Sequence, residues 1–433
     1  MPVAFVLLLL AANPAADHWP QWRGPLQTGV SLSADPPQTW DAEGTNVRWR
    51  TPLSGRGHST PIVWGDRIFV TAAIPIGPAM SPRPSTAPGN HDNSPVTHKQ
   101  RFVAIAINRA DGKVLWTKTL REAVPTEQGH RTASLASGSP VTDGERLYVL
   151  FGSFGLYCLD FQGEVLWQRD FGPLQSLHGH GEGSSPVLYG DKLLINWDHE
   201  GKSFAAALDK RTGEPIWKVD RTEVTSWATP IVVEHAGKPQ VIISGTSRIR
   251  GYDLATGKVL WECGGLSANV VASPVSDGEM VFAGSSYDKR ALLAIRLAGA
   301  TGDITDSRDQ IAWSRFRGTP YVPSPLLYEG ALYFLTHYQG ILSRVDGKTG
   351  EDRPGAVRLG DIGDIYASPV AAAGRVYVTD LNGATAVISS GEIPRLIAIN
   401  RLNEPVAASA ALSGRELFLR GEKHLYCIAE RAK

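Results

Sequence analysis

The amino-acid sequence predicts an all-β protein: an eight-bladed β-propeller of four-stranded blades, closed by an N-terminal strand that completes the last blade. Three observations support this fold class. A short motif recurs eight times, each repeat holds four β-prone runs, and six of the 12 Trp occupy the same place in the repeat. Helical periodicity is essentially absent, and a period of about 40 to 50 residues with four strands is typical of propeller blades.

The recurring motif is a small residue followed by Pro and two apolar residues. It places Pro at Pro61, Pro140, Pro186, Pro230, Pro274, Pro325 and Pro369, while the eighth copy carries Ala410 instead. The usual spacing is about 44 residues. Only the first spacing is much longer, because it contains residues 74–98, a stretch rich in Pro, Ser and Gly. We therefore predict that 74–98 is a loop inserted in blade 1.

The copy at 139–170 illustrates the four strands of a repeat. Its β-prone runs are separated by three turn signals, which are Asp143-Gly144, the stretch 152–155 and Gln162-Gly163. The eighth copy ends near Ala429 after only three such runs. Residues 46–53, NVRWRTPL, resemble the missing fourth strand. This strand would join the two ends of the chain in one blade and remove an open sheet edge.

The six recurring Trp lie near the end of the fourth strand of their repeats. Each is expected to cover its own blade and to pack against the next, which buries a large apolar area. These structural residues are Trp49, Trp116, Trp167, Trp217, Trp261 and Trp313.

The N-terminus has the features of a secretory signal peptide in residues 1–16. Its apolar run, from Pro2 to Ala12, is too short to span a bilayer and is followed by the small residues Ala15 and Ala16. Residues 17–45 are then an N-terminal extension and 46–433 a single propeller. We expect an exported, periplasmic protein without a transmembrane anchor, because no later stretch is apolar enough for a membrane helix.

Charge and cysteine content exclude several classes of function. The 43 Lys and Arg balance the 43 Asp and Glu, which argues against nucleic acid as a partner. The odd number of Cys and their apolar surroundings favour three buried free thiols, at Cys158, Cys263 and Cys427, over a disulfide with one thiol left over. The chain has no CxxC, GxSxG, HExxH or P-loop motif, so thiol redox, hydrolase and nucleotide chemistry lack support.

Three strings carry a family resemblance: AINRADGKVLW at 106–116, ALDKRTGEPIW at 207–217 and GYDLATGKVLW at 251–261. They resemble the pyrroloquinoline-quinone-like (PQQ-like) propeller repeat, and the similarity covers nearly all of residues 46–429. The opening HWPQWRGPLQTGVS also looks like the start of exported bacterial PQQ-like repeat proteins. This resemblance implies the propeller fold. It leaves function open, because the repeat occurs both in quinoprotein alcohol dehydrogenases and in BamB-type propellers.

The resemblance to quinoprotein dehydrogenases implies PQQ and calcium as possible cofactors. Those enzymes use a vicinal disulfide beside the quinone, a calcium ion held by Glu, Asn and Asp, an Asp base and a Trp floor. This chain has no adjacent Cys pair, and no calcium ligands can be assigned from its sequence. We therefore expect no cofactor, and PQQ with calcium rests on the resemblance alone.

Propeller geometry predicts where a ligand would bind. The fourth-to-first connections and the second-to-third hairpins emerge on one face, around the central channel, and nine of the 11 His fall in them. The ligand-binding residues predicted on these loops are His58, His130, Arg131, His178, His180, Glu182, Asp198, His199, Trp227, Asn269, Tyr321 and Tyr366.

The densest part of this face is SLHGHGEGSSP at 176–186. If the segment is extended, His178, His180 and Glu182 point to one side, with Asp198 and His199 in the hairpin of the same blade. Such a group could be a metal or acid/base site, a contact for another small ligand, or a structural Gly-rich loop. The identity of any metal stays open, and no residue is assigned a catalytic role.

Two functions remain at the level of sequence. The first is a noncatalytic binding or scaffold module that holds a protein, peptide or carbohydrate on the polar, His-rich loop face. The alternative is a quinone- or metal-dependent oxidoreductase with its site at the mouth of the channel. The regular scaffold and the missing catalytic signature favour the first.

Overall fold

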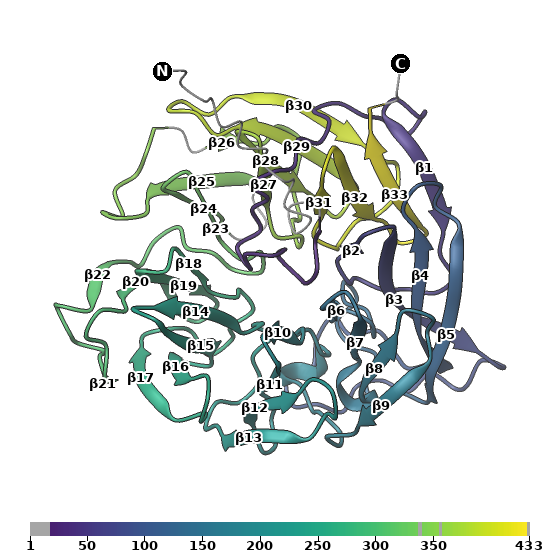
Figure 1. Ribbon diagram of the computed structural model, residues 1–433, viewed down its shortest axis with the longest axis horizontal. Helices are drawn as coiled ribbons and strands as arrows, with labels where there is room; N and C mark the ends of the chain where they lie inside the picture. Colours follow the sequence, from purple (N-terminus) through teal and green to yellow (C-terminus); the bar gives the residue numbers. More distant parts are fainter. Residues whose placement is uncertain (1–17, 337–339, 355–356, 431–433) are drawn as a thin grey trace, which may run out of the picture.

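The repeats fold into eight antiparallel sheets arranged in a ring (Figure 1). The computed structural model describes residues 18–336, 340–354 and 357–430. Seven of the described sheets have four strands and one has five. The predicted fold class, an eight-bladed β-propeller, is confirmed. The predicted signal peptide, residues 1–16, lies outside the described residues.

The blades follow the order of the chain, each from its innermost strand outward. Blades 1 to 4 consist of β2 (Ile62–Trp64), β3 (Arg67–Ile76), β4 (Lys99–Asn108) and β5 (Val114–Ala123); β6 (Val141–Thr142), β7 (Arg146–Leu150), β8 (Leu156–Asp160) and β9 (Val165–Arg169); β10 (Val187–Tyr189), β11 (Lys192–Trp197), β12 (Phe204–Asp209) and β13 (Pro215–Asp220); and β14 (Ile231–His235), β15 (Lys238–Gly245), β16 (Arg248–Asp253) and β17 (Val259–Gly264), with β21 (Gly302–Asp303) at the edge. Blades 5 to 8 consist of β18 (Val275–Ser276), β19 (Met280–Ser286), β20 (Arg290–Arg296) and β22 (Ile311–Arg315); β23 (Leu326–Tyr328), β24 (Ala331–Leu335), β25 (Ile341–Asp346) and β26 (Val357–Arg358); β27 (Val370–Ala372), β28 (Arg375–Thr379), β29 (Ala384–Ser389) and β30 (Leu396–Arg401); and β31 (Ala411–Ser413), β32 (Glu416–Arg420) and β33 (His424–Ala429), completed by β1 (Val47–Pro52).

The N-terminal strand closes the ring as predicted. Strand β1 pairs antiparallel with β33, in a register that places Thr51 opposite Leu425 and Pro52 opposite His424. The first strand of the propeller and the last therefore belong to one sheet, which leaves no blade with a missing outer strand. The predicted insertion connects β3 to β4, and because β3 continues to Ile76, the connection itself is 77–98.

The repeated Trp and the repeated Gly form one contact between neighbouring blades. In blade 3, Nε1 of Trp217 donates to the carbonyl oxygen of Leu254 in blade 4 at 2.9 Å. Gly257 of the same turn has φ +72°, and a Cβ there would lie 2.7 Å from the Trp217 ring. Gly is thus required both by the left-handed backbone and by the indole lying on it. Equivalent hydrogen bonds are made by Trp49, Trp116, Trp167 and Trp313 to the carbonyls of Arg109, Phe161, Lys210 and Gly347.

Trp261 is arranged differently from the other five. It is fully buried, and its Nε1 donates to Oε1 of Gln240 in its own blade at 2.8 Å. A Cβ on Gly251 would lie 2.3 Å from this Nε1, so the ring lies flat against its own sheet, in a buried cluster that includes Val281 and Leu293 of blade 5. The next blade has no short turn to receive it, because the connection after β20 is longer and contributes β21 to the edge of blade 4.

The N-terminal extension lies across the inner ends of the blades. Trp19 pairs with Val63 in blade 1, and Val30 pairs with Ala371 in blade 7. Between these points, Oε1 of Gln27 accepts from the backbone N–H of Val232 in blade 4 at 2.8 Å. Figure 1 shows this segment in purple, crossing the middle of the ring before β1. The extension therefore covers one end of the central channel.

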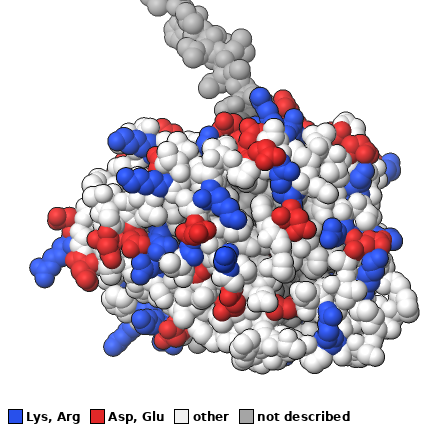
Figure 2. Space-filling view, turned by 90° about the horizontal axis from the view of Figure 1, so that it is seen from below, with Lys and Arg blue, Asp and Glu red and all other residues white. Residues whose placement is uncertain are grey.

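The surface matches the balanced composition of the chain. Figure 2 shows Lys and Arg interspersed with Asp and Glu over the visible face, without a large area of one sign. Across 18–336, 340–354 and 357–430 we find no helix with the length and hydrophobicity needed to cross a membrane.

Candidate functional site

A central cavity of about 460 Å³ brings most of the predicted ligand-binding residues together. This volume is in the range of sites for small ligands, about 300–1,000 Å³. Nine of the twelve predicted residues line it: His58, His130, Arg131, His180, Glu182, Trp227, Asn269, Tyr321 and Tyr366. Trp22 of the extension lines it too, so the segment that covers one end of the channel also forms part of the cavity wall.

A ring of eight hydroxyl side chains, one from each blade, also lines the cavity. Seven of these residues precede the Pro of the repeat motif and the eighth precedes Ala410; we call them the hydroxyl ring: Thr60, Ser139, Ser185, Thr229, Ser273, Ser324, Ser368 and Ser409. In the sequence this position serves only to count repeats. Its signal is that all eight copies carry Ser or Thr there, although any small residue would fit the motif.

Hydrogen bonds join seven of the eight ring residues to the next blade. The backbone N–H of Ser139 donates to Oγ of Ser185 at 3.0 Å, and that of Ser185 donates to Oγ1 of Thr229 at 3.0 Å. Five further bonds of 2.8–3.0 Å continue the series, from Thr60 to Ser139 and from Thr229 onward to Ser409. The ring thus fixes the first strand of each blade against its neighbour.

The inserted loop brings one further histidine to the mouth of this cavity. The ring centroid of His91 lies 5.0 Å from that of His178 and 4.7 Å from that of His180. Nδ2 of Asn93, in the same loop, donates to the backbone carbonyl of His178 at 2.6 Å. The centroid of His130 lies 5.0 Å from that of His180. The insertion therefore packs on the 176–186 segment of blade 3, an approach that the sequence alone did not indicate.

The 176–186 segment is not extended. Leu177–Gly179 form a short 3-10 turn, and His178 has φ 57°, in the left-handed region. Glu182 points away from the imidazoles, because Ser153 donates to its carboxylate through the backbone N–H, at 2.9 Å to Oε2, and through Oγ, at 2.5 Å to Oε1. His178, His180 and Glu182 therefore do not share one side, and His178 lies beside the cavity rather than in its wall.

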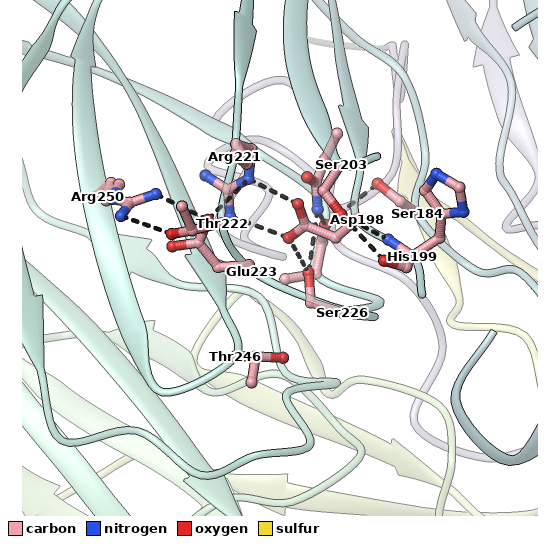
Figure 3. Close-up of polar contacts among 12 residues, drawn as sticks. Ser184, Asp198, His199, Ser203, Arg221, Thr222, Glu223, Ser226, Thr246 and Arg250 are labelled. Carbon is pink, nitrogen blue, oxygen red and sulfur yellow. Dashed lines mark hydrogen bonds and ion pairs between the residues drawn. The ribbon is translucent and has the colours of Figure 1, made fainter. Parts of the chain in front are cut away.

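Asp198 and His199 are held in contacts away from the cavity (Figure 3). Asp198 is buried and forms an ion pair with Arg221, and it also accepts a hydrogen bond of 2.6 Å from Oγ of Ser226. The His199 ring packs in its own hairpin, with Nε2 3.2 Å from the carbonyl oxygen of Lys202. Neither side chain lines the central cavity, because both are used within blade 3 and its contact with blade 4.

Burial shifts the pKa values of the titratable groups in the cavity. Burial, with the nearby Arg56 and Arg420, lowers the pKa of His58 to about 3. Burial and the neighbouring imidazoles of His130 and His91 lower the pKa of His180 to about 4. Burial raises the pKa of Glu182 to about 7. His58 and His180 are therefore neutral at neutral pH, while Glu182 is partly protonated.

The residues present do not fit a quinone and calcium site of the kind expected from quinoprotein dehydrogenases. Cys158, Cys263 and Cys427 are free and buried, which confirms the predicted thiols and leaves no vicinal disulfide. In the part of the chain that the structure describes, no group of three or more His, Cys, Asp or Glu is arranged so as to hold a metal ion. The four clustered imidazoles do not make such a group as they stand.

Comparison with protein families gives one match that covers most of the chain. A family model described as outer membrane protein assembly factor BamB matches residues 99–353 and 202–432. Among curated proteins, the chain is similar to methanol dehydrogenase (cytochrome c) subunit 1 of Methylorubrum extorquens, with 28% identity over 121 residues. That match covers 24% of this chain and 19% of the relative, so it spans only a small part of the dehydrogenase subunit.

Solved structures show the same architecture at low identity. BamB from Moraxella catarrhalis superposes with a TM-score of 0.55 at 15% identity, covering 82% of this chain and 98% of that one. Quinohemoprotein alcohol dehydrogenase from Comamonas testosteroni superposes with a TM-score of 0.62 at 11% identity, covering 98% of this chain and 82% of that one. At such identities these similarities support the fold alone.

Proposed function

Because this chain belongs to the family of the outer membrane protein assembly factor BamB, we propose that it is an exported, noncatalytic binding or scaffold module. Its ligand, a protein segment, a peptide or a carbohydrate, enters the central cavity through the His-rich loop face. The N-terminal extension covers the other end of the channel.

The observation that carries the proposal is the convergence of the loop-face residues on one cavity. Side chains from different blades, among them Trp227, Asn269 and Tyr321, line it together. Oδ1 of Asn269 is buried and has no hydrogen-bond partner in the described part of the chain, which favours a ligand group as its partner. Aromatic rings beside polar groups are typical of sites for peptides and sugars.

The electrostatics of the cavity favour binding over acid/base catalysis. The pKa values of His58 and His180 lie far below neutral pH, whereas efficient general acid/base groups have pKa values near the working pH. Glu182 has a pKa in the useful range, but its carboxylate is occupied by Ser153. The cavity therefore offers hydrogen bonds and aromatic surface, and no assembled catalytic group.

The alternative function is a quinone- or metal-dependent oxidoreductase with its site at the mouth of the channel. The similarity to a methanol dehydrogenase subunit favours this alternative. If PQQ binds, it supplies the redox chemistry, and this chain would contribute aromatic and hydroxyl surface around it. The isolated Cys residues and the lack of an assembled metal site in the described residues argue against it.

Two titrations of the purified full chain test the proposal by Trp fluorescence. The first uses a panel of peptides and oligosaccharides. We expect saturable, one-to-one binding that weakens at least tenfold in Trp227→Phe or Asn269→Ala and is unchanged in His235→Ala, a control outside the cavity. The second uses PQQ, with and without calcium. Tight, stoichiometric PQQ binding with dye-linked alcohol oxidation would overturn the noncatalytic proposal, as would a panel in which nothing binds at high micromolar concentration.

A further inference from the structure

We propose that the hydroxyl ring is a seat for an oxyanion group, so that the ligand of the central cavity carries a carboxylate or a phosphate. This inference rests on the proposed function, because it assumes that the same cavity binds the ligand. It adds the chemical class of that ligand, and it is tested with small anions rather than with the complete ligand.

The hydroxyl ring offers hydrogen-bond donors to the cavity. Seven of its eight oxygens accept a backbone N–H from the preceding ring residue. A hydroxyl group that accepts one hydrogen bond still carries a hydrogen to donate. Among the residues that the structure describes, none of the eight hydroxyls donates to a protein acceptor. All eight residues line the same cavity, so a group bound there can accept from those hydroxyls that lie nearest to it.

The seam between blade 8 and blade 1 leaves the ring incomplete. Thr60 receives no bond that would close the series from Ser409, and Oγ1 of Thr60 is buried without a partner in the described structure. Beside it, Oγ of Ser59 accepts from Nη1 of Arg420 at 2.6 Å. Ordered protein groups seldom leave a buried hydroxyl unpaired, so a bound group is the expected partner here.

Two buried guanidinium groups lie against this ring. Arg420 bonds to Ser59, next to the ring residue Thr60. Arg23, from the N-terminal extension, donates to the carbonyl oxygen of Pro325 at 2.6 Å and approaches that of Ser324, a ring residue, at 3.5 Å. Both side chains are 2% exposed. Each therefore places a positive charge within one residue of the ring, behind the cavity wall rather than in its lining.

Neither guanidinium has a carboxylate partner among the described residues, where no Asp or Glu lies within 4.0 Å of Arg23 or Arg420. The buried Arg221 and Arg375 are paired with Asp198 and Asp35, whereas the buried Arg344 also lacks a carboxylate in the described structure. Burial accordingly lowers the pKa values of Arg23 and Arg420 to about 9. A buried charge without a counterion is costly, and an anion in the cavity would offset that cost.

The two guanidinium charges select the class of ligand. Hydroxyl groups can bond to a neutral sugar or to an anion, but only a carboxylate or phosphate would gain from two positive charges that lack a carboxylate partner in the described part of the chain. The two carboxylates in the wall do not oppose an anion at the ring, because Asp92 is on an exposed loop and Glu182 is turned to Ser153. The ring and its two arginines together therefore favour an acidic ligand over a neutral one.

Titration of the full chain with sodium phosphate and with sodium acetate tests this inference. Each is compared with sodium chloride at the same ionic strength, by Trp fluorescence and by the thermal unfolding midpoint. With at least one oxyanion we expect saturable binding and a raised midpoint of thermal unfolding. Chloride should have no effect on either quantity. The stronger of the two anions identifies the end group. Equal behaviour of all three salts would overturn the inference.

The matched variants are Arg420→Gln and Arg101→Gln. Gln is polar but carries no charge, so Arg420→Gln should weaken oxyanion binding at least tenfold. Arg101→Gln, on an exposed outer strand pair, should leave it unchanged. Unchanged binding in Arg420→Gln would contradict the inference. If that variant does not fold, Arg23→Gln is measured in the same way. The two proposals can fail separately. If an oxyanion binds but no member of the peptide and oligosaccharide panel does, the oxyanion seat is supported and the proposed function is overturned. If a neutral ligand binds and phosphate does not displace it, the proposed function is supported and the oxyanion seat is overturned.

Discussion

The guanidinium of Arg221 holds the carboxylate of Asp198 at two points, Nε to Oδ1 at 2.6 Å and Nη2 to Oδ2 at 2.9 Å. Both side chains are inaccessible to solvent, and Ser226 satisfies a further lone pair of Asp198. The pair joins the hairpin of blade 3 to the segment that leads into blade 4 (Figure 3). A buried pair of this kind is a poor measure of net stability, but loss of one partner leaves the other charge uncompensated.

Asp198→Ala should therefore lower the free energy of unfolding by about 3 kcal/mol. We expect the lower end of the usual range because Glu223, 3.7 Å from Arg221, remains as a second counterion. Urea denaturation measures the change. The control is Asp111→Ala, which removes a surface pair with Lys113 and should change the stability by less than about 0.5 kcal/mol. Equal losses in the two variants would contradict this prediction.

The contact between Trp167 and Gly213 should make that glycine irreplaceable. Gly213 has φ +71°, and a Cβ there would lie 2.7 Å from Cε3 of Trp167. Gly213→Ala combines left-handed strain with overpacking, so we expect a loss of about 2–4 kcal/mol. Gly65 has a similar φ of +58° with no atom within 4 Å of its Cβ position.

Gly65→Ala is thus the matched control for Gly213→Ala, and it should lose only about 1 kcal/mol through its backbone. Thermal or urea unfolding of both variants separates the two contributions. A Gly213→Ala variant that is as stable as Gly65→Ala would show that the indole does not depend on that close approach.

Glu182 should make stability depend on pH. Burial raises its pKa from 4.5 to about 7 in the folded chain, so between these values the folded state binds more protons than the unfolded state. The protonated carboxyl therefore contributes to the free energy of unfolding at low pH. This contribution is lost as the pH rises toward 7 and above.

Glu182→Gln cannot lose a proton, so its stability relative to the natural protein should rise between pH 5 and pH 8. We expect a change of about 1–2 kcal/mol, because Glu182 as a residue is only partly buried and Ser153 stabilises its charged form by hydrogen bonds. Urea denaturation at both pH values measures it, with Glu164→Gln on the surface as control. A relative stability that falls with pH would contradict the assignment.

The three cysteines should be unreactive in the folded protein. All are buried, and burial raises the pKa of Cys158 to about 12 and that of Cys263 to about 11. The thiolate is the reactive form, so a disulfide reagent at pH 8 should modify no thiol within minutes in the native protein and three after denaturation. Rapid native modification of even one Cys would show that its strand opens locally.

Much of the fold could be predicted from the sequence because its contacts repeat. Each blade packs on the next in the same way, so Trp217 on Gly257 and its counterparts recur at the blade period and are visible in one chain. The closing strand could be predicted for the same reason, since the eighth repeat lacked only its outer strand. Loop order in a blade fixes which connections surround the channel, and nine of the twelve residues predicted on those loops line the central cavity.

The details of the site could not be predicted in this way, since they depend on contacts that occur once. The left-handed φ of His178, the turn of Glu182 toward Ser153 and the approach of His91 from the insertion follow from long-range packing and have no period. The use of Asp198 in an ion pair with Arg221 is likewise a single contact between two blades.

The sequence by itself determined the number of blades and the closure, because nearest-neighbour packing imposes one pattern on every repeat. Only the tertiary structure decided that the Ser and Thr at the start of each repeat motif meet in one ring, and that Arg23 and Arg420 lie against it with no carboxylate partner among the described residues. The reason is geometric: residues from all eight repeats, and from an extension outside them, come together only when the ring closes around its channel.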